Sequence, residues 1–453
     1  AAAQTAGDYK ALVCIFLQGG NDSFNTVLPT DSTSWANYTS VRNQQPDSLA
    51  LARDSVLPIS PLNAQGRTFA LNPALVQTQT LFNTDKRIAI LSNVGTLIEP
   101  INTKAEYETK AKRLPPKLFS HNDQQTTWQA LGPEGTAHGW GGRMADMIAS
   151  GNGNSLFTAI SATGNSVWLS GQSVKQYQVA ASGPVRFGTV LNQQGMPVVH
   201  NNEQVASALD RIVRANTKGS VFGADLATLA GRSIDAEKLL SQQLPAANHT
   251  SLGTDDDLKY FSPLFNSMQT SALAQQLKMV ARTIAARNGL GMKRQVFFVN
   301  LYGFDTHDNQ NKNHADLMAR LDHALKYFDA TLTRLGVNQQ VTTFTASDFG
   351  RTFTSNGDGS DHGWGAHHLV MGGAVKGGDI YGTFPIYGAK NSHNNQFDSS
   401  PDQIMNGALL PRVSVEQYGA TLARWFGLSD GQLADVFPNL ANFSAKNLGF
   451  MRA

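Results

Sequence analysis

Four apolar, strand-like runs of this chain stop abruptly beside Asp, His, Asn or Ser, and this pattern constrains the fold most. The runs and their polar neighbours are 12–17 before Asn21-Asp22-Ser23, 296–301 before Asp305-Thr306-His307, 341–345 before Ser347-Asp348, and 369–371 just after Asp361-His362. Continuous apolar runs are typical of strands buried on both faces of a parallel sheet. The carboxyl ends of such strands share one edge, where ligands bind. The pattern therefore predicts an open α/β sheet with a polar site at that edge.

The segments between these runs have helical periodicity, which favours helices packed against the sheet. Apolar residues spaced by three and four over 313–335 form one stripe, and Gly336 stands where the helix should end. Ser414 and Gln417 fit a capping box for a later helix that would stop at Gly427. The second half of the chain is therefore expected to alternate strands and helices.

The chain is expected to divide into four parts. Residues 155–200 suggest short strands, and residues 203–245 and 268–288 have helical spacing that interrupts the α/β pattern. The predicted parts are a flexible N-terminus over 1–8, a first half of the α/β core over 9–150, a largely helical insertion or cap over 151–290, and a second half of the core over 291–453.

Composition bounds the class of protein. With 453 residues, 41% of them hydrophobic, the chain can bury a large core. A net charge of +2 gives no indication of general nucleic-acid binding, and no apolar run approaches the roughly 18 residues of a membrane span. Cys14 is the only cysteine, which excludes an intramolecular disulfide and favours a buried, inert thiol.

The beginning of the sequence suggests export. The chain opens Ala1-Ala2-Ala3-Gln4-Thr5-Ala6 without an initiating Met, and small residues of this kind flank signal-peptidase cleavage sites. A trimmed fragment is the alternative. The low charged fraction of 15% also favours an exported protein, so we expect a cleaved signal peptide and a periplasmic or extracellular location.

Asp22, Asp305 and His307 are the first candidate metal ligands. Asp22 follows two glycines that let the backbone approach a ligand closely, and its carboxylate suits a cation; alternatively it caps a helix. Asp305 and His307 are two residues apart, so in a turn both side chains can converge on one ion. The alternative is a capping Asp beside a surface His.

Asp348, Asp361 and His362 complete the candidate ligand set. Asp348 lies in Ser347-Asp348-Phe349-Gly350-Arg351, where Arg351 suits an anionic oxygen or forms an ion pair with an Asp. Asp361 and His362 lie in a glycine-rich loop, and His362 is the strongest single candidate. The adjacent pair 367–368 is expected to be two hydrogen-bonded core histidines.

Ser120 is the candidate nucleophile. It precedes a segment with helical spacing, and a serine at a helix N-terminus can hold an anion or simply cap the helix. A neighbouring metal would lower its pKa. Thr96 is a weaker alternative, and the sequence contains no G-x-S-x-G elbow.

Taken together and in this order, the motifs resemble those of the domain-of-unknown-function 1501 family. They are Phe16-Leu17-Gln18-Gly19-Gly20-Asn21-Asp22 with Asn25, Ser120-His121, Gly303-Phe304-Asp305-Thr306-His307, Ser347-Asp348-Phe349-Gly350-Arg351-Thr352, and Asp361-His362-Gly363-Trp364-Gly365 through the glycines of 372–378. That family is mostly exported by bacteria, often by the twin-arginine route, and is related to the alkaline phosphatase and sulfatase superfamily.

The resemblance implies a doubly wound, alkaline-phosphatase-like α/β fold with a metal-assisted hydrolytic site. It implies one or two divalent ions, zinc before manganese, calcium or magnesium, held by Asp22, Asp305, His307, Asp348, Asp361 and His362. Phe349 stands where alkaline phosphatases usually have His, and the spacing of Asp305 and His307 is shorter than usual. One of two metal positions is therefore expected to be weakened, altered or missing.

Two functions follow as hypotheses. The first is an exported metal-dependent hydrolase of phosphate or sulfate esters, with in-line attack by Ser120 or a bound water and with Arg351 at the anionic substrate. The second is a non-catalytic secreted or cell-surface protein that keeps the fold, motivated by Phe349 and by the uncertain nucleophile. The sequence does not specify the oligomeric state.

Overall fold

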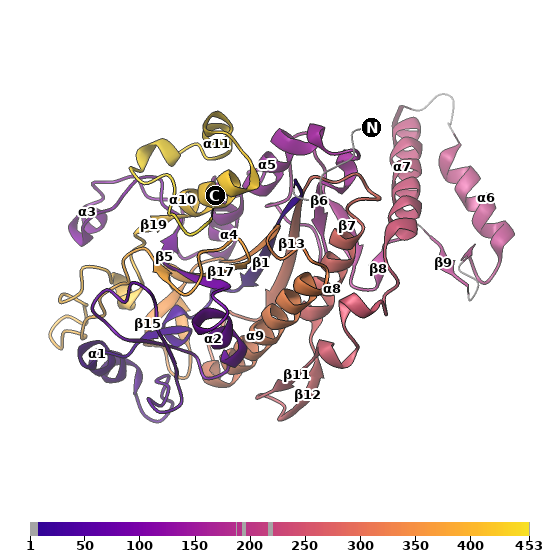
Figure 1. Cartoon of the computed structure of the whole chain (residues 1–453). Coiled ribbons are helices and arrows are strands. Elements are labelled where there is room, and N and C mark those ends of the chain that lie inside the picture. Colours follow the sequence, from indigo (N-terminus) through magenta and orange to yellow (C-terminus); the bar gives the residue numbers. More distant parts are fainter. Residues whose placement is uncertain (1–7, 187, 193–195, 216–220, 453) are drawn as a thin grey trace.

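A computed structural model describes residues 8–186, 188–192, 196–215 and 221–452. All but the last residue of the predicted flexible N-terminus, 1–8, lie outside the described residues. Figure 1 shows a central sheet covered by helices. Its strands, in spatial order, are β18 (Ile380–Tyr381), β5 (Ile88–Gly95), β17 (Ala366–Gly372), β14 (Val341–Ser347), β1 (Lys10–Gln18), β13 (Arg294–Tyr302), β6 (Ala159–Ser161), β7 (Tyr177–Ala180) and β8 (Gly183–Pro184), with β19 (Val413–Ser414) also paired to β5.

Most neighbouring strands of this sheet are parallel. β1 pairs in parallel with β13 on one side and β14 on the other, and β6 and β7 continue the parallel run. β17 is antiparallel to both of its neighbours, β14 and β5. Because β17 runs in the opposite direction to β14, its beginning lies at the edge where β14 ends. The loop before β17 therefore meets the loops that follow β1, β13 and β14.

Helices cover both faces of the sheet, which confirms the doubly wound α/β class. Alternate residues of β1 enter two separate apolar cores, Val13 and Ile15 on one face and Cys14 and Phe16 on the other. The helices of the first core are α1 (Ser32–Arg42), α2 (Val76–Asn83), α8 (Ala272–Ala285) and α9 (Gln310–Arg334), together with the later part of α7 (Val221–Gln243) through Ala236 and Leu240. Those of the second are α4 (His121–Ala130), α5 (Trp140–Ile148), α10 (Val415–Phe426) and α11 (Asp430–Val436). The short α3 (Lys104–Glu108) lies outside both cores. Cys14 is buried, as expected.

Local sequence signals position the helices of the second half well. α10 begins at a capping box in which the Ser414 side chain accepts from the backbone of Gln417 and the Gln417 side chain accepts in return. It ends at Gly427 in the left-handed region, with φ 117°. Both ends are therefore as predicted. α8 begins at Ala272, four residues later than the predicted helix, because 267–270 forms strand β12 instead.

Residues 151–290 contain several kinds of structure. β6, β7 and β8 extend one edge of the central sheet, and α8 packs on its face. The helices α6 (Glu203–Arg214) and α7 (Val221–Gln243) lie beyond that edge, with the pair β9 (Val190–Leu191) and β10 (Pro197–Val198) beside α6 (Figure 1). The boundaries predicted for an insertion remain a prediction.

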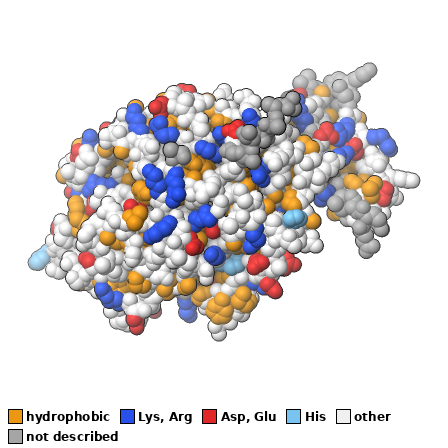
Figure 2. Space-filling model, viewed as in Figure 1, with side chains coloured by type: hydrophobic (Ala, Val, Ile, Leu, Met, Phe, Trp, Pro, Cys, Tyr) orange, Lys and Arg blue, Asp and Glu red, His pale blue; other side chains and the backbone are white. Residues whose placement is uncertain are grey.

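Besides the β9–β10 pair, three further small sheets lie outside the central sheet in the described residues. They are β2 (Val27–Pro29) with β4 (Phe69–Leu71) and β3 (Leu57–Ile59), β11 (Lys259–Ser262) with β12 (Ser267–Thr270), and β15 (Arg351–Ser355) with β16 (Ser360–His362). The β11–β12 hairpin exposes Phe261, Phe265 and Met268, and Figure 2 shows the resulting apolar group at the lower edge of this face. Among the described residues, no helix has the length and apolarity needed to cross a membrane.

Candidate metal centre

The polar loops meet at one edge of the sheet, as the order of the strands requires. Asp305 and His307 follow β13, and Asp348 follows β14 directly. His362 ends β16, only a few residues before the antiparallel β17 begins. His121, the first residue of α4, reaches the same place from the other half of the core.

Three imidazoles converge on the carboxylate of Asp305. The Nε2 atom of His121 lies 3.3 Å from Asp305 Oδ2, and the Nε2 atoms of His307 and His362 lie 3.0 and 3.3 Å from Oδ1. The Nε2 atoms of His307 and His362 are 3.0 Å apart. Ligands bound about 2.0–2.1 Å from a tetrahedral ion are separated by roughly 3.3 Å. His121, Asp305 and His362 each offer a ligand atom within 4.8 Å of the others, so these three suit one metal ion, with His307 beside them. We call His121, His307, His362 and Asp305 the histidine–aspartate cluster.

The outer nitrogens of two of these histidines are fixed by oxygen acceptors. His121 Nδ1 lies 2.7 Å from Asp348 Oδ2, and His362 Nδ1 donates to the carbonyl of Phe119 over 2.7 Å. A proton on Nδ1 leaves the Nε2 lone pair of the neutral ring facing the cluster. Such oxygen partners are typical of metal-binding histidines, because they set both the tautomer and the orientation of the ring.

The third histidine is held more loosely. His307 Nδ1 lies 3.4 Å from Asp361 Oδ1, and both side chains are more than two-fifths exposed. Asp361 also accepts a hydrogen bond from Asn356. The predicted ligand Asp361 thus lies behind His307 and away from the Asp305 carboxylate.

One buried atom of the cluster has no well-formed hydrogen bond. His121 Nε2 is shielded from solvent and makes no hydrogen bond among the described residues, although it lies 3.3 Å from Asp305 Oδ2. A buried ring nitrogen without a partner is costly unless something binds it. Together with the convergence on Asp305, this atom shows that the residues fit a metal ion that prefers imidazole and carboxylate ligands.

The electrostatics of the cluster favour an ionised carboxylate. Burial alone would raise the pKa of Asp305, but the hydrogen bond and charge of Arg351 outweigh it and hold that pKa below its ordinary value. The hydrogen bond that His121 donates to Asp348 raises the pKa of His121, whereas burial lowers that of His362. Asp305 is therefore an anion beside ring nitrogens, which is the charge pattern that a divalent cation requires.

Arg351 is buried behind Asp305. Its Nη1 donates to Asp305 Oδ1 over 2.7 Å and to the carbonyl of Gly19 over 3.2 Å, while Nε and Nη2 donate to the hydroxyl and carbonyl of Ser360. The predicted site residue Arg351 thus holds the carboxylate in place, in the ion pair that sequence analysis kept as its alternative.

Asp348 contacts the cluster through the outer ring nitrogen of His121. Besides His121, it accepts hydrogen bonds from the backbone of Gly19 and from Gln125 Nε2, and its side chain is fully buried. The predicted ligand Asp348 therefore contacts a ring and not the inner face of the cluster. Asp22 lies outside the cluster as well, because its carboxylate is enclosed by Arg42 and Gln310.

Ser120 lies between two residues that contact the cluster. Its Oγ donates to Asp123 Oδ2 over 2.9 Å, and it makes no capping bond to the helix that it precedes. The preceding residue, Phe119, has a φ of 72°, an uncommon backbone conformation for a bulky side chain. Backbone of this kind is over-represented at functional sites, where the surrounding structure holds it in place.

A hollow of about 320 Å³ opens beside the cluster. It is lined by Phe119, His307, Thr352, Asp361, His362, Met405 and Asn406. Part of its wall is therefore formed by the rings of His307 and His362. A larger hollow of about 600 Å³ lies between α9 and the β11–β12 hairpin, away from these histidines.

His121 is a site residue that was not predicted from the sequence. Its motif was noted for Ser120 alone, and its partner Asp348 is 227 residues away in the chain. One local signal was available: His121 and Gln125 stand four residues apart on α4, so both face Asp348. The pair at 367–368 is confirmed as hydrogen-bonded core histidines, each with Nδ1 bonded to a neighbour.

Comparison with known proteins gives a family and weak structural likenesses. The model of a family described as "Protein of unknown function (DUF1501)" matches residues 9–437. No curated protein matches the chain.

Three solved structures resemble this chain at low identity. One is Ps i-CgsB in complex with k-i-k-neocarrahexaose, at 11% identity over 96% of this chain and 76% of that chain, with a TM-score of 0.35. A mutant of the alkaline phosphatase PafA matches at 11% identity over 77% of this chain and 64% of that chain, with a TM-score of 0.29. A Bacteroides thetaiotaomicron protein, described under metabolism of multiple glycosaminoglycans, matches at 10% identity over 94% and 74%, with a TM-score of 0.36. Likenesses this weak say nothing about activity.

Proposed function

Since this chain belongs to the DUF1501 family, whose description assigns no activity, we propose a function from the histidine–aspartate cluster: metal-dependent hydrolysis of ester substrates. One observation carries the proposal, the convergence of three Nε2 atoms on the Asp305 carboxylate. Three imidazoles and one carboxylate suit zinc best among common divalent ions, before manganese, calcium or magnesium.

The surrounding residues support this role. His121, His307, His362 and Asp305 would hold the ion, and Arg351 keeps Asp305 ionised and oriented. A bound divalent ion would supply Lewis-acid polarisation of an ester oxygen. The hollow beside His307 and His362 gives a substrate access to the accessible side of the cluster.

Ser120 is the proposed nucleophile, with a bound water as the alternative. The hydrogen bond from Ser120 Oγ to Asp123 supplies a carboxylate that can take the hydroxyl proton during attack. Asp123 is almost fully buried, and its Oδ1 lies 3.6 Å from Lys117 Nζ. Phosphate and sulfate esters are the proposed substrates, because the motif resemblance points to them and an anionic oxygen suits a cationic centre.

The proposal is tested by measuring metal and turnover together. The protein, purified without chelators, is expected to contain a divalent metal by mass spectrometry and to hydrolyse p-nitrophenyl phosphate or p-nitrophenyl sulfate. The variant Asp305→Ala/His362→Ala should lose both, whereas Asp308→Asn, an exposed carboxylate in the same loop, should keep both. Turnover that survives the double substitution would refute the mechanism. Bound metal without turnover of any ester would favour the non-catalytic alternative.

Export is a further part of the proposal. The motif resemblance and the low charged fraction support a periplasmic or extracellular location. Fractionation of the native bacterial host, with detection by antibody, checks it. Recovery of the protein only with cytoplasmic markers would contradict it.

A further inference from the structure

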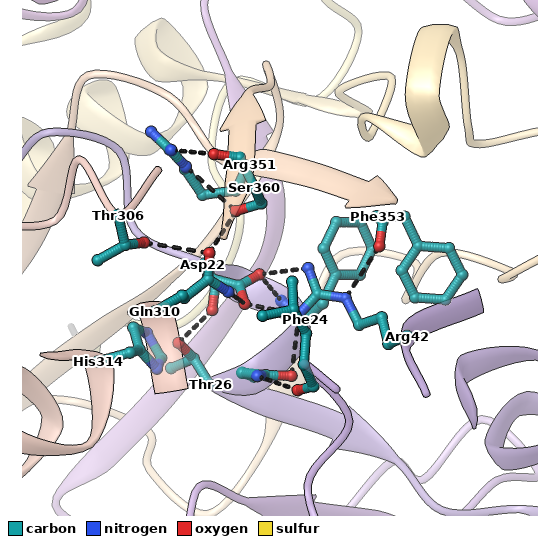
Figure 3. A network of polar contacts seen from close by, with 12 residues as sticks. Asp22, Phe24, Thr26, Arg42, Thr306, Gln310, His314, Arg351, Phe353 and Ser360 are labelled. Carbon is teal, nitrogen blue, oxygen red and sulfur yellow. Dashed lines mark hydrogen bonds and ion pairs between the residues drawn. The ribbon is translucent and has the colours of Figure 1, made fainter. Parts of the chain in front are cut away.

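The carboxylate of Asp22 is enclosed by donors from three segments (Figure 3). Arg42, at the end of α1, donates Nη1 to Oδ2 over 2.6 Å and Nη2 to Oδ1 over 3.0 Å. Gln310, at the start of α9, donates Nε2 to Oδ2 over 2.7 Å, and the backbone of Phe24 donates to Oδ1 over 3.2 Å. The Asp22 side chain is 0% exposed. Both oxygens therefore accept hydrogen bonds, and the described residues leave none of the Asp22 side chain exposed.

Arg42 is equally well satisfied. Its Nε donates to the carbonyl of Phe353, Nη2 also donates to the carbonyl of Thr352, and Nη1 also donates to Asn25 Oδ1, at 3.0, 3.0 and 2.9 Å. The guanidinium carbon lies 5.0 Å from the ring centre of Phe24 and 5.7 Å from that of Phe353, within reach of cation–π attraction. Arg42 is thus a fully buried cation that is fixed from every side.

This ion pair lies close to the histidine–aspartate cluster. Gln310 Oε1 accepts from the Ser360 hydroxyl over 2.5 Å, and the same hydroxyl accepts from Arg351 Nε over 3.3 Å (Figure 3). Arg351 in turn donates to Asp305. A short chain of hydrogen bonds therefore runs from Asp22 through Gln310, Ser360 and Arg351 to Asp305. Two guanidinium groups contact this chain, that of Arg42 at Asp22 and that of Arg351 at Asp305.

We infer that the guanidinium of Arg42 permanently fills the cation position beside Asp22, so that the centre binds one metal ion and not two. A divalent ion at Asp22 would lie close to the charge of Arg42 and would find both carboxylate oxygens already bonded. The inference rests on the proposed function, because it needs the cluster of His121, His307, His362 and Asp305 to be the one metal site.

Native mass spectrometry of the whole protein with excess zinc tests the inference. One bound ion per chain is expected. Two ions per chain would overturn the role of Arg42 and leave the proposed metal-dependent function standing. No bound ion with zinc or manganese would instead overturn the proposed metal centre itself, so the two failures are distinct.

Substitutions locate the ion. Asp22→Asn is expected to keep one ion per chain while lowering the melting temperature, and Asp305→Asn to lose the ion. Asp22→Asn/Arg42→Gln removes both charges at similar size and provides a second measurement if Asp22→Asn does not fold. A falling ion count in either Asp22 variant, in folded protein, would overturn the inference.

Discussion

Asp22 and Asp305 occupy equivalent places in the sheet and have opposite surroundings. Each follows one of two adjacent parallel strands, β1 and β13, by a few residues, and each pairs with an arginine. The Asp22 side chain is 0% exposed and closed by donors, whereas that of Asp305 is 43% exposed and faces three imidazole nitrogens. The comparison teaches that strand position gathers carboxylates at one edge, while burial and partners decide which of them can bind a ligand.

The largest expected effect is on metal binding at Asp305. Asp305→Ala removes the carboxylate on which three rings converge, so metal affinity should fall by more than the roughly 10–100-fold typical of losing an outer partner. Asp22→Ala should leave affinity nearly unchanged. Competition with a chromogenic zinc chelator measures both. Equal losses of metal affinity in the two variants would contradict the contrast between an Asp305 that binds metal and an Asp22 that does not.

The second effect is on stability, and it should fall on the other carboxylate. Asp22→Ala leaves the buried guanidinium of Arg42 unpaired, which should lower the free energy of unfolding by about 3–5 kcal/mol. Asp305→Ala should cost less, because its site is open to water that can solvate Arg351. Urea unfolding of the metal-free proteins measures both.

A double-mutant cycle sharpens this prediction. Asp22→Leu/Arg42→Met replaces both charges with apolar groups, so it should be less destabilising than either single substitution. Additive losses in the cycle would contradict the picture of one closed ion pair.

The third effect compares two outer carboxylates. Asp348 is fully buried and holds His121 over 2.7 Å, whereas Asp361 is half exposed and lies 3.4 Å from His307. Asp348→Asn should therefore weaken metal binding about 10–100-fold, and Asp361→Asn much less. The same chelator competition applies. A larger loss of metal affinity for Asp361→Asn than for Asp348→Asn would mean that Asp361, and not Asp348, is the more important partner of a metal-binding histidine.

The contrast between Asp22 and Asp305 also marks what the sequence can predict. The apolar runs and glycine stops give the strands, the helices and the edge at which the polar loops gather, because those signals are local. The partner of Asp22 is an arginine on a separate helix, and the partner of His121 is 227 residues away. Nothing in either local motif distinguishes a carboxylate that is closed by a guanidinium from one that faces imidazoles.

Strand direction is a second feature that the local sequence does not predict. The polar segment before run 369–371 joins the site only because β17 is antiparallel to β14. An apolar run has the same appearance in either direction, so the sequence shows that His362 precedes a strand and not at which edge of the sheet that strand begins. The start of α8 is a smaller error of another kind, since the short segment 267–270 pairs with β11 as a strand and the local sequence does not show that pairing.

The last expected effect concerns histidines that are closed off as Asp22 is. Burial lowers the pKa of His314 to about 4 and those of His367 and His368 to about 3. These histidines have an ordinary pKa near 6.5 in the unfolded chain, so below that pH the unfolded chain binds protons that the folded chain does not bind. Stability should therefore be complete above about pH 7 and fall as the pH drops from about 6.5 towards 4, by up to about 1.4 kcal/mol per pH unit for each histidine.

His121 should act with the opposite sign in the metal-free protein. Its pKa is raised by Asp348, so its contribution is present below about pH 6.5 and is lost as the pH rises through the raised value. Urea unfolding at pH 7.5, 6.5 and 5.5 measures the net slope. His368→Gln should reduce the acid-side loss, whereas His393→Gln, an exposed histidine, should leave it unchanged. A slope that His368→Gln does not alter would mean that the buried histidines take up protons in the folded state. Burial would then be a weaker barrier to charged species than the geometry indicates, and the contrast between the buried Asp22 and the exposed Asp305 would be smaller.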